Sequence, residues 1–186
     1  MNWKRFGLAA LGCTCLISAG AFALEPQDEE LAMPGPEPEH AYLMESVGTW
    51  DCTMKMWEGP GEPTMGTGTE VNRSIGGLHV VSDFKSEVMG MPFEGHGITS
   101  WDPRKQKYIS IWVDSFEPTP AILEGTYDEA TKTMTFSGEG QMMGETMRMR
   151  EVITAPDADH RVFKMYITPP GAAEMLSMQF EYTRRK

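Results

Sequence analysis

The 186-residue chain is acidic, with 16 Lys and Arg against 27 Asp and Glu and a formal net charge of -11. Its length suits one domain with a core that needs no disulfide or metal to fold. Nucleic acids and anionic membranes select basic surfaces, so the charge argues against both as partners. The chain has 19 Gly and 13 Pro, which indicates many turns and argues against a helical bundle.

The first 23 residues have the pattern of a signal peptide. Lys4 and Arg5 give a positive start, and an uncharged, largely apolar run follows over residues 7–19. This run is too short, and too soon followed by acidic residues, for a membrane-spanning helix. Ala21-Phe22-Ala23 then supplies the small-x-small pattern that signal peptidase accepts. We therefore expect cleavage after Ala23 and a periplasmic or secreted protein.

Export changes the cysteine count. Removal of the signal peptide takes Cys13 and Cys15 with it and leaves Cys52, so the mature chain cannot form an intramolecular disulfide. We expect Cys52 to be buried in a strand rather than reactive. Lipidation of Cys13 or Cys15 is the less favoured alternative, because Leu11 stands where a lipoprotein signal has a small residue.

Between the signal and the first periodic segment, residues 24–39 are rich in acidic residues and proline. Such a segment cannot bury enough apolar surface to offset its ordering entropy, and we expect an extended, solvated leader. Residues 40–47 then carry apolar side chains at helical spacing, which predicts a short helix that ends at Gly48. The folded domain is expected over residues 40–186.

From Gly48 onward the hydrophobic period is two, as in β-strands. Trp50, Cys52, Met54 and Met56 fall on one face of the first run. Nine further runs follow, separated by turn signals rich in Gly, Pro and Asp: 66–74, 78–88, 93–101, 108–115, 121–127, 133–140, 146–154, 161–168 and 175–184. The gaps are too short for parallel crossovers. Ten antiparallel strands would expose two long edges unless they closed, so an all-β, up-and-down barrel is expected.

Gly48-Thr49-Trp50, just after a short helix and at the start of the first strand, looks like the opening signature of the lipocalin-like (calycin) barrels. In that superfamily the Trp closes one end of the barrel and an Arg near the end of the last strand packs across it. The resemblance therefore implies that Trp50 and Arg184 form the barrel closure.

A second resemblance covers residues 34 to 185, nearly all of the mature chain. Its motifs are Pro34-Gly35-Pro36 leading to His40, Gly48-Thr49-Trp50, Met89-Gly90-Met91-Pro92-Phe93-Glu94-Gly95, Trp112-Val113-Asp114 and Glu124-Gly125-Thr126-Tyr127-Asp128. Together they are similar to a bacterial family of secreted barrels catalogued only as a domain of unknown function. The resemblance implies a fold and carries no established reaction, so it assigns no catalytic residue.

Methionine is abundant, at 16 residues, and several methionines are two residues apart in the predicted strands. Thioethers favour Cu(I), and an exported protein could bind copper through them. A spacing of two also places both side chains on one face of a strand, where methionine fills irregular space. We favour the lining of a barrel interior over copper binding.

The four histidines give no metal-ligand spacing, so the sequence predicts no metal site. A haem-binding protein could use one of them as an axial ligand, but the sequence favours no particular histidine and has no Cys-x-x-Cys-His motif. Neither a nucleophile elbow nor a phosphate-binding loop is present, and the catalytic residues of any enzyme stay unknown. The sequence leans away from an enzyme and predicts no resident cofactor.

We expect the barrel to bind a small apolar molecule in its interior. If Trp112 and Asp114 point inward, they give that pocket a stacking surface and an anchor, and the glycines beside His96 leave room for its ring. The predicted ligand-binding residues are Met54, Met56, His96, Trp112, Asp114 and Tyr166. The alternatives are an enzyme acting on a small hydrophobic substrate, a haem or Cu(I) protein, and a structural barrel filled by its own side chains.

Overall fold

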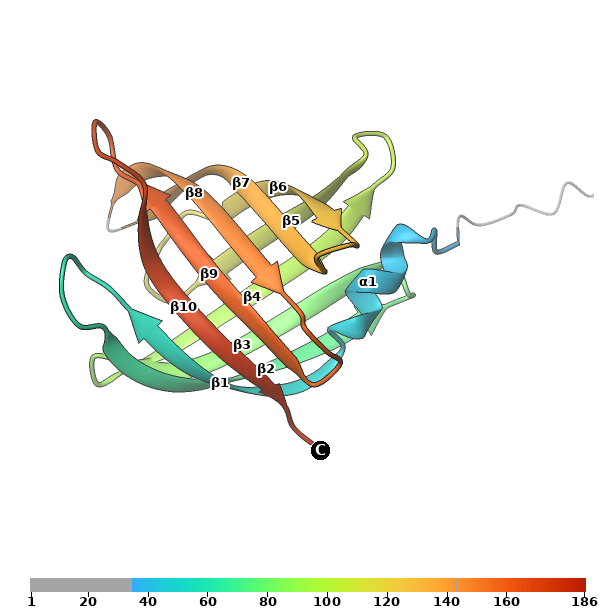
Figure 1. The fold of residues 1–186 in the computed structure, drawn as a ribbon, viewed down its shortest axis with the longest axis horizontal. Coiled ribbons are helices and arrows are strands. Elements are labelled where there is room, and N and C mark those ends of the chain that lie inside the picture. The colour runs from blue at the N-terminus through green and yellow to red at the C-terminus, as the bar shows by residue number, and fades with distance from the viewer. Residues whose placement is uncertain (1–34, 143) are drawn as a thin grey trace, which may run out of the picture. The chain divides into compact units, whose positions relative to one another are not determined.

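The structure, a computed structural model, describes residues 35–142 and 144–186. The predicted signal peptide and most of the predicted leader lie outside the described residues. A short helix, α1 (Glu39–Glu45), precedes ten strands (Figure 1). These are β1 (Gly48–Met56), β2 (Thr64–Ile75), β3 (His79–Val88), β4 (Met91–Asp102), β5 (Lys107–Asp114), β6 (Ala121–Asp128), β7 (Thr133–Met142), β8 (Glu145–Thr154), β9 (His160–Thr168) and β10 (Met175–Arg184).

Every strand pairs antiparallel with its neighbours along the chain, and β1 also pairs with β10. The register places Trp50 opposite Arg184 and Met56 opposite Met178, which closes the sheet. The predicted ten-stranded, up-and-down antiparallel barrel with a short N-terminal helix is therefore confirmed. The ends of the strands lie within two residues of the predicted ends.

Alternation along each strand separates the interior from the outer surface. In β1, Trp50, Cys52 and Met54 are buried, whereas Asp51 and Thr53 are exposed. The same alternation and the strand register identify the inward residues of the other strands. Cys52 is buried, as predicted, and desolvation raises the pKa of its thiol to about 12.

Helix α1 packs against one end of the barrel, which we call the proximal end; the opposite end is the distal end (Figure 1). Leu43 of the helix is 3% exposed and belongs to the barrel core. The helix begins at Glu39, one residue earlier than predicted. The Tyr108 hydroxyl donates a hydrogen bond to the Glu39 carbonyl, and the Trp101 indole donates one to the Glu37 carboxylate. These contacts hold the end of the predicted leader against the barrel.

Two clusters of buried side chains fill parts of the interior. The first lies beneath α1 and consists of Leu43, Val80, Tyr108, Leu123, Met134, Phe136 and Met149. The second centres on β1 and consists of Trp50, Cys52, Met54, Phe84 and Tyr182. No helix within the described residues is long and apolar enough to cross a membrane.

Candidate functional site

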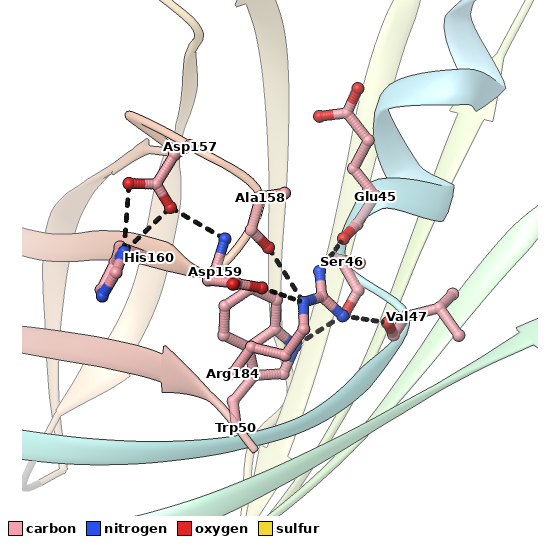
Figure 2. Close-up of polar contacts among 9 residues, drawn as sticks. All are labelled: Glu45, Ser46, Val47, Trp50, Asp157, Ala158, Asp159, His160 and Arg184. Carbon is pink, nitrogen blue, oxygen red and sulfur yellow. Dashed lines mark hydrogen bonds and ion pairs between the residues drawn. The ribbon is translucent and has the colours of Figure 1, made fainter. Parts of the chain in front are cut away.

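The proximal end is sealed by Trp50 and Arg184 (Figure 2). The Arg184 guanidinium carbon lies 4.2 Å from the centre of the Trp50 ring, and Trp50 donates its indole N–H to the Ser46 carbonyl at 2.8 Å. The guanidinium also donates hydrogen bonds to three backbone carbonyls, those of Val47 (2.6 Å), Glu45 (2.7 Å) and Ala158 (2.9 Å). Because Arg184 joins the helix end, β1 and the β8–β9 turn, its role here is architectural.

A buried ion pair lies just inside this seal. Arg161 donates to the Glu70 carboxylate at 2.5 Å, and the two side chains are only 12% and 11% exposed. The Arg161 guanidinium also stacks on Trp50 and Tyr182, with its central carbon 4.5 and 4.2 Å from the ring centres. Asn72 donates a further hydrogen bond to Glu70 at 2.7 Å. Both charges therefore have partners, although the buried Nε of Arg161 has none among the described residues.

The inner wall formed by β8, β9 and β10 is less buried than the two clusters, although its Phe163 and Phe180 pack against the second one. Its side chains point inward by register, yet several are only half-buried, which means that water-sized space reaches them inside the barrel. They are Glu151, Phe163, Met165, Met178 and Phe180. Phe163 and Phe180 pack together with ring centres 5.5 Å apart. Thioether and aromatic surfaces thus make up the less buried part of the inner wall.

Glu151 is the polar group on this wall. The register places it between Phe136 on β7 and Met165 on β9. Burial raises the pKa of its carboxyl to about 7, because protein rather than water surrounds the charge. Across residues 35–142 and 144–186, no side chain or backbone group forms a hydrogen bond or ion pair with this carboxylate.

Trp112 and Asp114 also face the interior. Gly95 and Gly97 on the adjacent strand leave room for the Trp112 indole: a Cβ at Gly95 would lie 2.1 Å from its ring. The Trp112 N–H donates to Asp114 at 3.0 Å, and Asp114 also accepts the backbone N–H groups of the turn that follows. The Asp114 carboxylate therefore orients the indole and caps a turn, rather than serving as a free anchor.

Met54 and Met56 occupy different environments. Met54 is 1% exposed and packs in the second cluster, where Gly66 makes room for its methyl group. Met56 is half-buried and lies beside Met178, toward the distal end. Only Met56 of this pair therefore approaches the less buried part of the interior.

His96 and Tyr166 lie on the outer face of the barrel. The His96 ring hydrogen-bonds the exposed Asp83 carboxylate at 2.7 Å. Tyr166 stacks beneath Arg150, whose guanidinium carbon is 4.1 Å from the ring centre and which pairs with Glu174. The glycines beside His96 make room for Trp112, not for the imidazole. The structure therefore does not bring these two residues together with the inward-facing candidates.

An open depression of about 480 Å³ lies on the outer surface of β1, β2 and β10. Its lining is polar and includes Asp51, Thr69 and Glu181. Asp51 already pairs with Arg185, which lowers the pKa of its carboxyl, and Glu181 pairs with Lys55. Among the described residues, no group of three or more His, Cys, Asp or Glu side chains could hold a metal ion. We therefore place the candidate site inside the barrel.

The sequence reasoning did not select Glu151 as a site residue. Its position in the predicted run of residues 146–154 put it on the same face as Met147 and Met149, which lie inward in the structure. A carboxylate on an otherwise apolar inward face was the available signal. What the sequence could not reveal is that no residue described by the structure forms a hydrogen bond or ion pair with it.

The comparisons with known proteins agree with this architecture. The sequence model of the family described as "Protein of unknown function (DUF1579)" matches residues 35–184. No curated protein matches the chain. Among solved structures, the S-type phycobiliprotein lyase CPES from Guillardia theta is similar, with a TM-score of 0.60 and 12% identity over 80% of this chain and 93% of that one. Rv2717c from M. tuberculosis also scores 0.60, with 13% identity over 81% of this chain and 99% of that one. At these identities the likeness is one of fold.

Proposed function

Because the chain belongs to the DUF1579 family of proteins of unknown function, its role must be argued from its own interior, and we propose that the barrel binds a small, mainly apolar molecule there. The observation that carries this proposal is the half-buried inner wall of β8, β9 and β10. A barrel filled by its own side chains would bury these inward residues as completely as it buries Met54 and Phe136, which are 1% and 2% exposed.

The lining has the chemistry of an apolar binding site. Phe163 and Phe180 offer flat surfaces, and Met56, Met165 and Met178 offer flexible thioethers that adapt to irregular shapes. Affinity would come from the apolar surface that ligand and wall remove from water together. We further propose that the protein acts in the periplasm or outside the cell, on the strength of the signal pattern in residues 1–23.

Native mass spectrometry of the protein purified from its own host tests the proposal directly. We expect a ligand-bound mass that disappears after organic extraction. The extracted protein should then bind the neutral reporter N-phenyl-1-naphthylamine with an increase in reporter fluorescence. Apo mass alone, together with no fluorescence change, would overturn the proposal.

A matched pair of substitutions locates the site. Met165→Trp places an indole on the inner wall of β9, where it fills the space, and should weaken reporter binding at least about tenfold by steric exclusion. Lys164→Trp places the same indole on the outer face of the same strand and should leave binding within about twofold. Circular dichroism establishes that both variants fold, and equal affinities in two folded variants would contradict an interior site.

A further inference from the structure

Glu151 lies deep within the barrel. Strand β8 begins at the distal end with Glu145, so Glu151 is six residues inside, about 20 Å along the strand. Its neighbours in register are Phe136 and Met165, and its neighbours on the inner face of its own strand are Met149 and Ile153. An ionisable group thus stands on an apolar wall that faces accessible space.

An inward-facing carboxylate without a protein partner is costly to desolvate, and Glu151 is half-buried, with its oxygens outside the set of fully buried, unpartnered atoms. Glu70 shows how this barrel satisfies a carboxylate that only supports the fold, since Arg161 and Asn72 both reach it. No described residue does the same for Glu151. Burial alone accounts for the raised pKa of its carboxyl, which means that no nearby cation offsets the desolvation.

The distal end is acidic, which adds an independent observation. Its three longer loops, residues 57–63, 115–120 and 169–174, contain no Lys or Arg and carry Glu58, Glu62 and Glu117, together with Glu174, which pairs with Arg150. The loops at the proximal end carry both signs, with Arg104, Lys105 and Lys132 beside Glu129, Asp157 and Asp159. A rim of one sign raises the local concentration of ligands of opposite charge and repels those of the same charge.

We propose that Glu151 anchors the ligand of the interior site, and that this ligand is an apolar molecule carrying a basic amine. The inference rests on the proposed function and names the class of molecule bound. The ammonium group would form a charge-assisted hydrogen bond with the Glu151 carboxylate, while the apolar body lies against Phe163, Met165 and Phe180. Entry through the acidic distal end favours a cation over a fatty acid of the same length.

The test compares three probes that share a twelve-carbon chain: dodecylamine, dodecanol and dodecanoate. Each displaces N-phenyl-1-naphthylamine from the full chain at pH 8, where Glu151 is largely ionised, below the aggregation concentration of the probe. We expect dodecylamine to compete at least roughly tenfold better than dodecanol, the scale of one hydrogen bond to a charged group, and dodecanoate to compete worst.

Glu151→Gln keeps the shape of the side chain and removes its charge. It should lose the preference for dodecylamine over dodecanol, when both are measured as displacement of the reporter from the same variant. Glu139→Gln is the matched control, because Glu139 is an exposed carboxylate on the outer face of the neighbouring strand β7, and this variant should retain the preference.

The outcomes separate the two proposals. Absence of reporter binding to the wild type would overturn the proposed function itself. Reporter binding with no preference for the amine, or with a preference that survives in Glu151→Gln, would leave an apolar site and overturn the anchor. Loss of the preference in Glu139→Gln as well would assign it to general surface charge and also overturn the role of Glu151.

Discussion

Glu70 and Glu151 are two carboxylates inside the same barrel with opposite surroundings. Glu70 lies beneath the proximal seal, where Arg161 and Asn72 bind it. Glu151 lies on the half-buried wall of β8 with no described partner. The comparison teaches that two inward carboxylates of one barrel can differ in their partners, and this difference is the basis of the anchor proposed at Glu151.

The largest loss of stability should follow from removing Arg161, the cation that pairs with Glu70. Arg161→Met keeps much of the side-chain volume but strands a buried carboxylate, and should reduce the free energy of unfolding by about 3–5 kcal/mol. Urea unfolding at pH 7 measures the loss. The double variant Glu70→Gln/Arg161→Met removes both charges and should recover at least half of it. A single variant as stable as the wild type would show that the pair does not support the fold.

Neutralising Glu151 should increase the free energy of unfolding instead of reducing it. Its folded-state pKa, about 7, lies above the ordinary value of 4.5, so the folded protein loses stability as the pH rises from about 4.5 to 7. Glu151→Gln removes this loss and should be more stable than the wild type at pH 8, by about 3 kcal/mol, and about equally stable at pH 4.5. Urea unfolding at both pH values measures this, and a variant less stable at pH 8 would mean that an undetected partner satisfies the carboxylate.

The contacts of Arg184 with Trp50 and the backbone should contribute less to the free energy of unfolding than the buried Arg161–Glu70 pair. Arg184→Met loses three hydrogen bonds to backbone carbonyls and the stacking on Trp50, and should cost about 2 kcal/mol. Arg185→Met is the control, because Arg185 pairs with Asp51 where both side chains are about half exposed. That variant should unfold at nearly the same urea concentration as the wild type, because solvent screens an exposed pair. Equal losses in thermal or urea unfolding would contradict a special role for Arg184.

The smallest effect should come from His96. Its partner Asp83 is exposed and also pairs with Arg73, so His96→Gln should change the free energy of unfolding by less than about 0.5 kcal/mol. Reporter affinity should also be unchanged, because the imidazole lies on the outer face. A tenfold loss of reporter binding in this variant would place the site on the outer surface instead of the wall that holds Glu151.

The sequence was sufficient for the strands and the closure of the barrel. Alternation in residues 48–56, with Trp50, Cys52 and Met54 on one face, required a half-buried strand, and turn residues marked where each strand ended. The short connections excluded parallel pairing, and ten strands with no other cover for their edges required closure. These inferences depend on local patterns, which the structure preserves.

The site residues were harder to predict from the sequence, because several strands carry apolar or aromatic residues on both faces. On β9, Phe163 and Met165 face inward and Tyr166 faces outward, yet each is an acceptable pocket residue by type. His96 was misleading for a related reason, since the small residues beside it serve Trp112 on the other face of the strand. Partnership is a three-dimensional property, so no sequence pattern distinguishes the satisfied Glu70 from the unsatisfied Glu151.

The pairing of β1 with β10 has a consequence for how the chain folds. Strand β1 cannot complete its pairing until β10 is available, because the closing contacts join the two ends of the domain. Contacts of such large sequence separation slow folding relative to proteins with local contacts. Until Met175–Arg184 is in place, β1 and β9 present two open edges that invite pairing with other chains. A product truncated before Met175 should therefore aggregate rather than persist as a smaller barrel.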